Sequence, residues 1–259
     1  MNKKYLIITI SLFVAVGICT ALLFMTDSVA YSTMFSIFIP ILVGTIINYD
    51  LKQKEIYLRY YEPIYRYIVT YHDILSQPFN RLTMGKKHDM IKKLSRDMTK
   101  FLNDNLEYAS ENVCEILEIN FFYEYENYDN QNEYQDVYNL NRLIPILCNE
   151  IIENYNALYF NHFVFRKIYL KKEVPHKSFR LIYSYVDSIL INIAQKEIDF
   201  SLYELNKFYQ MLLSYRRENY KKYFKIYLFL KKNKKLNNDE IIDFMNKNFG
   251  FKILDYKKR

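Results

Sequence analysis

Two apolar stretches near the amino terminus constrain this chain more than any other feature of its sequence. Residues 5–25 and 31–48 contain no charged side chain, and a short connection that includes Asp27 separates them. At about 1.5 Å of rise per helical residue, each stretch is long enough, or nearly so, to cross a hydrocarbon core of about 30 Å. The pattern predicts a transmembrane helical hairpin at residues 1–48. A cleaved signal peptide is the alternative, since residues 28–30 resemble a cleavage site, but the apolar core of such a peptide is shorter.

Basic residues on both sides of the hairpin predict its orientation. Lys3 and Lys4 precede the first stretch, and Lys52 and Lys54 follow the second, whereas the connection holds no lysine or arginine. The positive-inside rule therefore places both termini in the cytoplasm. We expect a multi-pass protein of the inner or plasma membrane, with the lipid bilayer around the hairpin and residues 49–259 in the cytosol.

Small residues recur four positions apart within both stretches. Gly17 and Ala21 share one face of the first expected helix, and Ser36, Pro40 and Gly44 share one face of the second. Small side chains let helix backbones approach each other closely. Either the two helices of one hairpin pack together along these faces, or hairpins from several copies associate, and the second reading predicts a homo-oligomer.

Glycine is scarce, and this scarcity predicts an all-α fold. The chain has 4 glycines and 51% hydrophobic residues. Parallel sheets, tight hairpins and Gly-rich phosphate loops need glycine where the backbone turns or approaches a ligand. The cysteines have no metal-ligand spacing. We therefore expect a helical cytosolic domain at residues 49–259, with no cofactor, no metal site and no identified catalytic residue.

Apolar residues at helical spacing divide this domain into expected helices. These cover residues 49–76, 90–102, 110–121, 134–172, 178–195 and 202–229, with a short helix after residue 238. Residues 79–89 and 124–135 are expected to be loops. Pro63 should kink the first helix or restart it, and Pro175 should end the segment before it, because proline disfavours helix in the preceding residue.

The densest run of positive charge lies between residues 216 and 235. Aromatic residues alternate with the cations there, and Glu218 is the one acid. The candidate anion-binding residues are Arg216, Arg217, Lys221, Lys222, Lys225, Lys231, Lys232, Lys234 and Lys235. Three readings fit this segment: an amphipathic helix with solvated lysines, a surface for anionic lipid, or a surface for single-stranded nucleic acid with aromatics stacked on bases. A formal charge of +7 on the chain favours some anionic partner.

Two His-Asp dipeptides and one Arg-His pair are the remaining candidates for chemistry. Helical metal-dependent phosphohydrolases use such dipeptides, but the chain has only 4 histidines, so we interpret His72-Asp73 and His88-Asp89 as surface histidines beside carboxylates. Arg81 and His88 resemble, in type and spacing, the pair in the helical HEPN ribonucleases. In that family the histidine is the acid/base and the arginine holds phosphate. The resemblance implies a ribonuclease site at these two residues.

The layout of the whole chain resembles small bacterial membrane proteins of phage-defence and abortive-infection systems. The resemblance lies in the paired amino-terminal spans, the cytoplasmic bulk and the basic segment 216–235. It implies a membrane-anchored, non-enzymatic effector or scaffold whose helical domain binds a partner or signal while the hairpins oligomerise. This is our leading hypothesis. A membrane-tethered binder of single-stranded nucleic acid that uses residues 215–235 is the first alternative, and a HEPN-like ribonuclease is the second.

Overall fold

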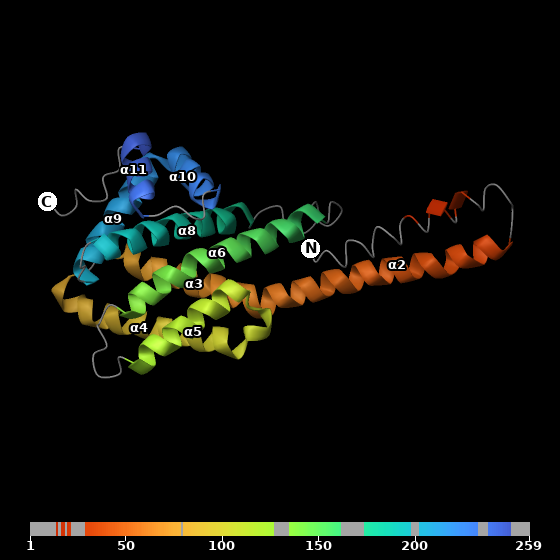
Figure 1. Ribbon diagram of the computed structural model, residues 1–259, viewed down its shortest axis with the longest axis horizontal. Helices are drawn as coiled ribbons and strands as arrows, with labels where there is room; N and C mark the ends of the chain where they lie inside the picture. Colours follow the sequence, from red (N-terminus) through yellow and green to blue (C-terminus); the bar gives the residue numbers. More distant parts are fainter. Residues whose placement is uncertain are drawn as a thin grey trace. The chain divides into compact units, whose positions relative to one another are not determined.

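The protein is helical throughout the part of the chain that the structure describes. The computed structural model describes residues 14, 17–18, 20–21, 29–78, 80–126, 135–161, 174–197, 202–232 and 238–249, and none of these lies in a β-strand (Figure 1). The all-α prediction is therefore confirmed. The chain divides into two compact units, Met1–Arg59 and Tyr60–Arg259.

Helix α2, Val29–Ile56, belongs to the first unit and contains the second of the two expected spans. Among the described residues, no helix combines the length and the apolar character that crossing a membrane requires. In α2, serine, threonine, proline and asparagine are interspersed among the apolar residues, and charged residues begin at Asp50. The predicted span at 31–48 and the predicted multi-pass membrane localisation are therefore wrong. The predicted span at 5–25 falls mostly outside the described residues.

A single π-helical turn, η1 (Tyr57–Tyr61), joins α2 to α3 (Glu62–Ser76). Pro63 has no amide hydrogen, so the carbonyl of Arg59, four residues earlier, lacks the donor of an α-helical hydrogen bond. Single π turns occur inside helices at such interruptions. The kink or restart expected at Pro63 takes this form, and the division between the two units falls inside the turn.

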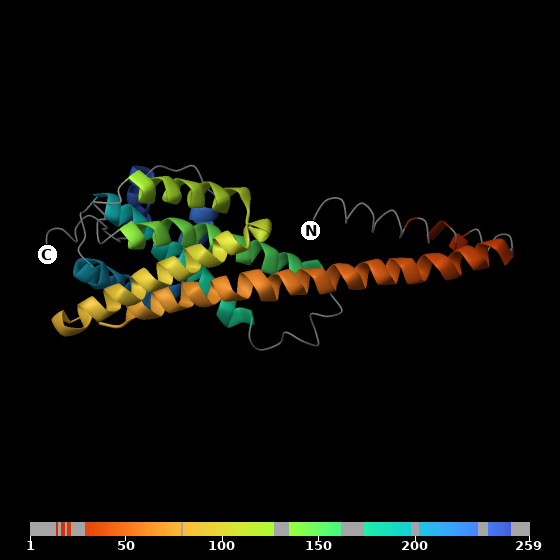
Figure 2. The ribbon, with the colours of Figure 1, turned by 90° about the horizontal axis from the view of Figure 1, so that it is seen from below.

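The second unit is a bundle of helices built around α6 and α8. Its helices after α3 are α4 (Arg81–Asp104), a 3-10 turn η2 (Leu106–Tyr108), α5 (Glu111–Glu126), α6 (Gln135–Asn161), α8 (Val174–Glu197), α9 (Leu202–Glu218), α10 (Tyr220–Lys232) and α11 (Asn238–Phe249). Helices α6 and α8 lie side by side with the most extensive contact in the bundle (Figures 1 and 2). Helix α3 contacts α4, α6, α8 and α9, while α5 packs on α6, α10 on α8 and α11 on α10.

The apolar stripes expected from the sequence form the core of this bundle. On α6 and α8 the buried stripe residues are Leu140, Ile144, Leu147, Ile151, Ile182, Val186, Leu190 and Ile193. They recur every three or four residues, which places each set on one side of its helix. Full burial of one such side chain contributes about 1.5–3 kcal/mol. The α6–α8 pair is therefore the centre against which the remaining helices are positioned.

Helix α4 begins inside a segment that we expected to be a loop. The side chain of Asn80 accepts a hydrogen bond of 2.8 Å from the amide of Thr83, and the hydroxyl of Thr83 accepts one of 3.2 Å from the amide of Asn80. This capping box satisfies two amides that the first helical turn leaves without partners. Gly85 is helical, so the predicted loop at 79–89 is wrong from residue 81 onward.

Two further boundaries differ from the expected ones. Pro175 lies in the first turn of α8, which begins at Val174, so this proline opens a helix instead of closing the segment before it. Proline is well tolerated there because the first amides of a helix have no partner within the helix. The helix expected over 202–229 is divided into α9 and α10 at Asn219. Helix α5 extends to Glu126, and residues 127–134 of the second expected loop lie outside the described residues.

Side chains of α9 satisfy the last carbonyl groups of α3. The amide nitrogen of Asn206 donates to the carbonyls of Leu75 (2.7 Å) and Gln77 (3.0 Å). The amide nitrogen of Gln210, one turn later, donates to the carbonyl of Ser76 (2.8 Å). The last carbonyls of a helix have no partner within it and must bond elsewhere when they are buried. These bonds fix α9 against the carboxyl end of α3.

Candidate functional site

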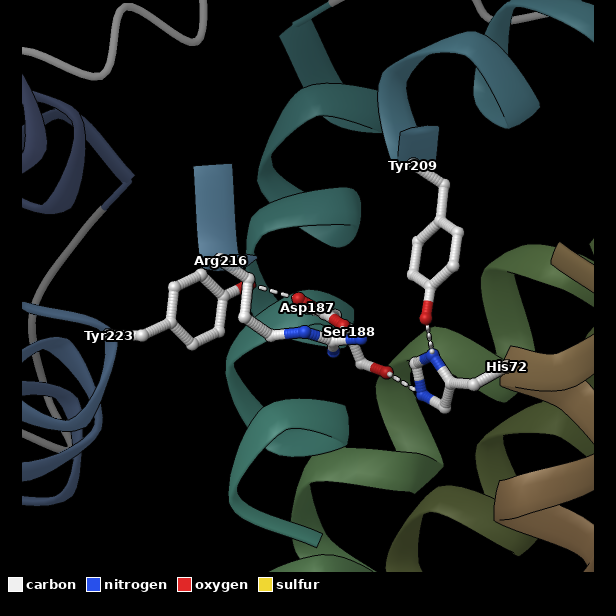
Figure 3. A network of polar contacts seen from close by, with 6 residues as sticks. All are labelled: His72, Asp187, Ser188, Tyr209, Arg216 and Tyr223. Carbon is white, nitrogen blue, oxygen red and sulfur yellow. Dashed lines mark hydrogen bonds and ion pairs between the residues drawn. The ribbon is translucent and has the colours of Figure 1, made fainter. Parts of the chain in front are cut away.

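A buried cluster of polar side chains lies where α3, α8, α9 and α10 meet (Figure 3). It consists of His72 from α3, Asp187 and Ser188 from α8, Tyr209 and Arg216 from α9, and Tyr223 from α10. We call these six residues the buried polar cluster. Its side chains come from four helices and contact one another inside the bundle, and it is therefore the first candidate for a site.

The sequence brings three of these residues together by their spacing. Tyr209, Arg216 and Tyr223 follow one another at seven-residue intervals, and seven residues make about two turns of an α-helix. All three side chains therefore lie on the same side of the α9–α10 segment, although the helix is interrupted at Asn219. That side faces α8 and brings the three residues to Asp187.

Asp187 is the centre of the buried polar cluster. Its side chain is 1% exposed, and Oδ2 lies 2.9 Å from Nη1 of Arg216. The hydroxyl of Tyr223 donates to Oδ1. Burial raises the pKa of Asp187 above its usual value, while Arg216 and the two tyrosines of the buried polar cluster act to lower it. The carboxylate thus connects α8 to both sides of the interruption between α9 and α10.

Arg216 is held by more than its ion pair. Its guanidinium carbon lies 4.7 Å from the ring centroid of Tyr183, within the range of a cation–π contact. Burial is the largest influence on the pKa of Arg216 and acts to lower it, but Asp187 together with Tyr209, Tyr223 and Tyr183 outweighs burial, so this pKa is raised. The arginine is therefore a fixed cation inside the bundle.

His72 extends the buried polar cluster to α3. Its Nδ1 lies 3.0 Å from the hydroxyl oxygen of Tyr209, and its Nε2 lies 3.5 Å from Oγ of Ser188. Burial, followed by repulsion from Arg216, lowers the pKa of His72 from 6.5 to about 3, so the imidazole is neutral near pH 7. These two contacts place the imidazole between α8 and α9 and join both helices to α3.

A serine within hydrogen-bond distance of a histidine, in a cluster that also holds an aspartate, resembles a nucleophile and its base, but burial argues against that use. Ser188 and Asp187 are 0% exposed and His72 is 7% exposed. A nucleophile must reach its substrate, and general-base catalysis requires a reacting group within hydrogen-bond distance. In the described residues no group of three or more His, Cys, Asp or Glu could hold a metal ion. The arrangement therefore suits the joining of four helices better than chemistry on a substrate.

The expectation that both histidines lie on the surface is wrong for His72 and only partly right for His88. His72 is buried, whereas Asp73 beside it is exposed, so the two side chains of that dipeptide lie on different sides of α3. His88 is half-buried on α4 and Asp89 is exposed. Arg81 is the first residue of α4, and His88 lies seven residues later in the same helix. The ribonuclease hypothesis stays a prediction.

The basic segment does not form one continuous surface. Arg216 is occupied by Asp187, and Lys231 is half-buried with its ammonium 5.9 Å from the ring of Tyr227. Lys234 and Lys235 lie outside the described residues. The exposed cations of the segment are Arg217, Lys221, Lys222, Lys225 and Lys232. The aromatic residues of the segment also divide between the core and the surface. Tyr223 and Tyr227 are buried, whereas Phe224 is exposed.

One side of α10 is basic and partly apolar. Lys221, Lys225, Leu228 and Lys232 follow at intervals of three or four residues, and Phe224 lies beside them. Phe224 is 40% exposed and Leu228 is 50% exposed. We call these five residues the α10 outward face. The opposite side of the helix packs on α8, so the outward face is presented at the surface of the bundle.

The small residues expected to pack membrane helices are accessible in the described residues. Gly17, Ala21, Ser36 and Pro40 are exposed, and Gly44 is half-buried. A Cβ atom added at Gly17 or at Gly44 would meet nothing within 4 Å. The glycines of the two stripes therefore have room beside them, which leaves space for a second helix.

Sequence reasoning missed the buried polar cluster as a unit. Its signals were the seven-residue spacing of Tyr209, Arg216 and Tyr223, and an aspartate placed among the apolar residues of α8. Comparison with known protein families, with curated proteins and with solved structures finds no match to this chain. The likeness of layout to phage-defence proteins therefore stays a prediction, without its membrane component.

Proposed function

We propose that this protein is a non-enzymatic scaffold in which α2 associates with α2 of a second copy while the helical second unit binds a macromolecular partner. The observation that carries this proposal is the apolar surface of α2. Ile37, Ile41, Val43, Ile47 and Leu51 are between 46% and 59% exposed. An apolar helix whose sides are left open needs a covering surface, since large apolar patches mark interaction sites.

A second copy of α2 is the partner whose chemistry fits best. From Val29 to Tyr49 the helix carries no charged side chain, so a charged surface opposite it would lose hydration without gaining a partner. Another α2 offers the same apolar side chains. Gly44 lies on the same stripe as Ser36 and Pro40, and it leaves room for the close approach of a second backbone.

The buried polar cluster supports a non-enzymatic role for the second unit. Its potential nucleophile, Ser188, and its potential base, His72, are both enclosed by the bundle. Its remaining groups are used on each other, as the contacts of Asp187 illustrate. A bundle fixed in this way suits the presentation of a binding surface.

Substitution of Gly44 tests the proposal. Gly44→Leu should reduce the oligomer, because the larger side chain keeps the two backbones apart. Gly85→Leu is the matched control, since Gly85 is also helical with nothing within 4 Å of an added Cβ, but it lies on α4. The measurement is sedimentation velocity of the full chain in aqueous buffer, together with chemical cross-linking. A wild-type chain that stays monomeric would refute the proposal.

A charge on α2 gives an independent test of the same contact. Ile41→Asp places a carboxylate on an exposed part of α2 and should disperse the oligomer, because burial of an unpaired charge is costly. Leu106→Asp, at a comparably exposed residue outside α2, should leave it intact. Oligomers that survive both Ile41→Asp and Gly44→Leu would place the contact elsewhere and remove the role given to α2.

A further inference from the structure

The α10 outward face has the chemistry of a site for an extended polyanion. We infer that it binds the phosphodiester backbone of single-stranded nucleic acid and that Phe224 stacks on one base. Lysine ammonium groups contact phosphate as point charges, without the geometric demands of a bidentate pair. Exposed aromatic rings among cations are the arrangement by which single-strand binders hold bases. Lys221 and Lys225 stand on either side of Phe224 in the sequence, within one helical turn of it.

The lysines of this face stand on a helix that is already fixed. On the opposite side of α10, Tyr223, Ile226, Tyr227 and Leu230 are 0–4% exposed. Tyr223 donates to Asp187, so the first turn of α10 is joined to α8 by a hydrogen bond as well as by packing. Binding on such a face does not require the backbone of α10 to be ordered first, which reduces the entropic cost of association.

The composition of the face favours nucleic acid over an acidic protein partner. Protein interfaces are depleted in lysine and enriched in arginine, tyrosine and tryptophan. On the α10 outward face every cation is a lysine, and the one aromatic residue is a phenylalanine. Nucleic-acid affinity comes mainly from the release of counterions by lysine and arginine at phosphates, which does not require deep packing.

The structure also limits which aromatic residues of α10 can contact a base. Tyr223 and Tyr227, which alternate with the lysines in the sequence, are buried, so they are not available to bases. Phe224 is left as the exposed aromatic ring of the face. One stacking position gives little sequence preference, and most of the affinity should depend on salt. Single strands should be preferred to duplexes, because stacking on Phe224 needs an unpaired base.

This inference rests on the proposed function in that it names the partner of the second unit. The inference makes no use of α2, so the inference and the proposed self-association of α2 can be refuted independently. A chain that binds nucleic acid without self-association removes only the scaffold, and a chain that self-associates without binding removes only the inference.

The test measures the fluorescence anisotropy of a labelled oligouridylate with the full-length protein over a range of salt concentrations. If the three lysines of the α10 outward face, Lys221, Lys225 and Lys232, each contact a phosphate, log Kobs should fall with log salt at a slope of about −2.1. Lys225→Glu combined with Lys232→Glu should weaken binding by more than roughly tenfold and make the slope shallower by about 1.4.

Two more variants separate charge from stacking and from non-specific effects. Phe224→Ala should weaken binding by roughly tenfold and leave the salt slope unchanged, because it removes stacking alone. Lys93→Glu combined with Lys100→Glu is the matched control, since both residues are exposed on α4 and lie seven positions apart, as do Lys225 and Lys232. This control should bind like the wild type.

Three outcomes would overturn the inference. The first is a wild-type chain that does not bind the oligouridylate at low salt. The second is a control pair on α4 that weakens binding as much as the α10 pair does. The third is displacement of the probe by polyglutamate as effective as displacement by unlabelled oligouridylate, with no effect of Phe224→Ala. That last result would assign the face to acidic protein segments.

Discussion

Asp187→Asn tests whether the buried polar cluster holds the helices of the second unit together. The substitution keeps the shape of the side chain and removes the charge that Arg216 and Tyr223 contact. Loss of one partner from a buried ion pair costs about 3–5 kcal/mol. Here the Arg216 side chain is 23% exposed, so water partly solvates the guanidinium, and the asparagine retains one acceptor oxygen. We therefore expect the free energy of unfolding to fall by about 2–3 kcal/mol.

Urea and thermal unfolding of the full chain, followed by far-ultraviolet circular dichroism, measure this loss. A fall of that size lowers Tm by roughly 4–12 °C for a domain of this size. Asp73→Asn is the matched control, because Asp73 is exposed on α3 and should change stability by less than about 0.5 kcal/mol. If Asp187→Asn is no more destabilising than Asp73→Asn, the buried polar cluster does not join the helices and this reasoning is refuted.

A double-mutant cycle then separates the contribution of the Arg216–Asp187 ion pair to stability from that of the hydrogen bond between Tyr223 and Asp187. Arg216→Gln alone leaves the carboxylate of Asp187 buried without its cation. Combined with Asp187→Asn, it leaves two neutral amides at the same place. The double variant should be less destabilised than the sum of the single variants, since contacting residues do not act additively.

Two further predictions concern acid stability and the end of α3. Because the pKa of His72 is lowered in the folded state from 6.5 to about 3, its contribution to stability is complete above about pH 6.5 and is lost as the pH falls toward 3. His72→Asn should flatten the decline in urea midpoint between pH 7 and pH 4; an unchanged decline would contradict the pKa assignment. The raised pKa of Asp187 acts in the opposite direction, so variant and wild type are compared at each pH. Asn206→Ala should lower the free energy of unfolding by about 1–3 kcal/mol, because the carbonyls of Leu75 and Gln77, at the carboxyl end of α3, each lose one donor. Lys207→Ala, at the exposed neighbouring position, should change it by less than about 0.5 kcal/mol in the same assay.

Local patterns predicted most of the helices, because helix formation and the burial of one side depend on nearby residues. The stripe Leu140, Ile144, Leu147 and Ile151 predicted α6 and its buried side, and all four are buried. The start of α4 was missed because Gly85 and its cationic neighbours were interpreted as a loop. A capping box between Asn80 and Thr83 has an asparagine and a threonine where serine and glutamate are usual, so the signal was weaker.

The membrane prediction failed for a related reason. It was based on the absence of charge over residues 31–48, and that segment does form part of one helix. Absence of charge is a weaker criterion than apolar character, because serine, threonine, asparagine and proline are uncharged but not strongly apolar. No described helix meets the combined requirement of length and apolar character.

The buried polar cluster could not be predicted from local pattern, since its members come from four helices and meet only in the folded bundle. The cations of the run 216–235 were grouped together as candidate anion-binding residues, yet successive residues of a helix point about 100° apart. Arg216 points toward Asp187, whereas Arg217 beside it is exposed. Charge in a helical segment therefore has to be assigned by helical phase before a surface is inferred. On α10 the same phase that buries Tyr223 exposes the lysines, so packing on α8 and presentation of the α10 outward face are two consequences of one amphipathic pattern.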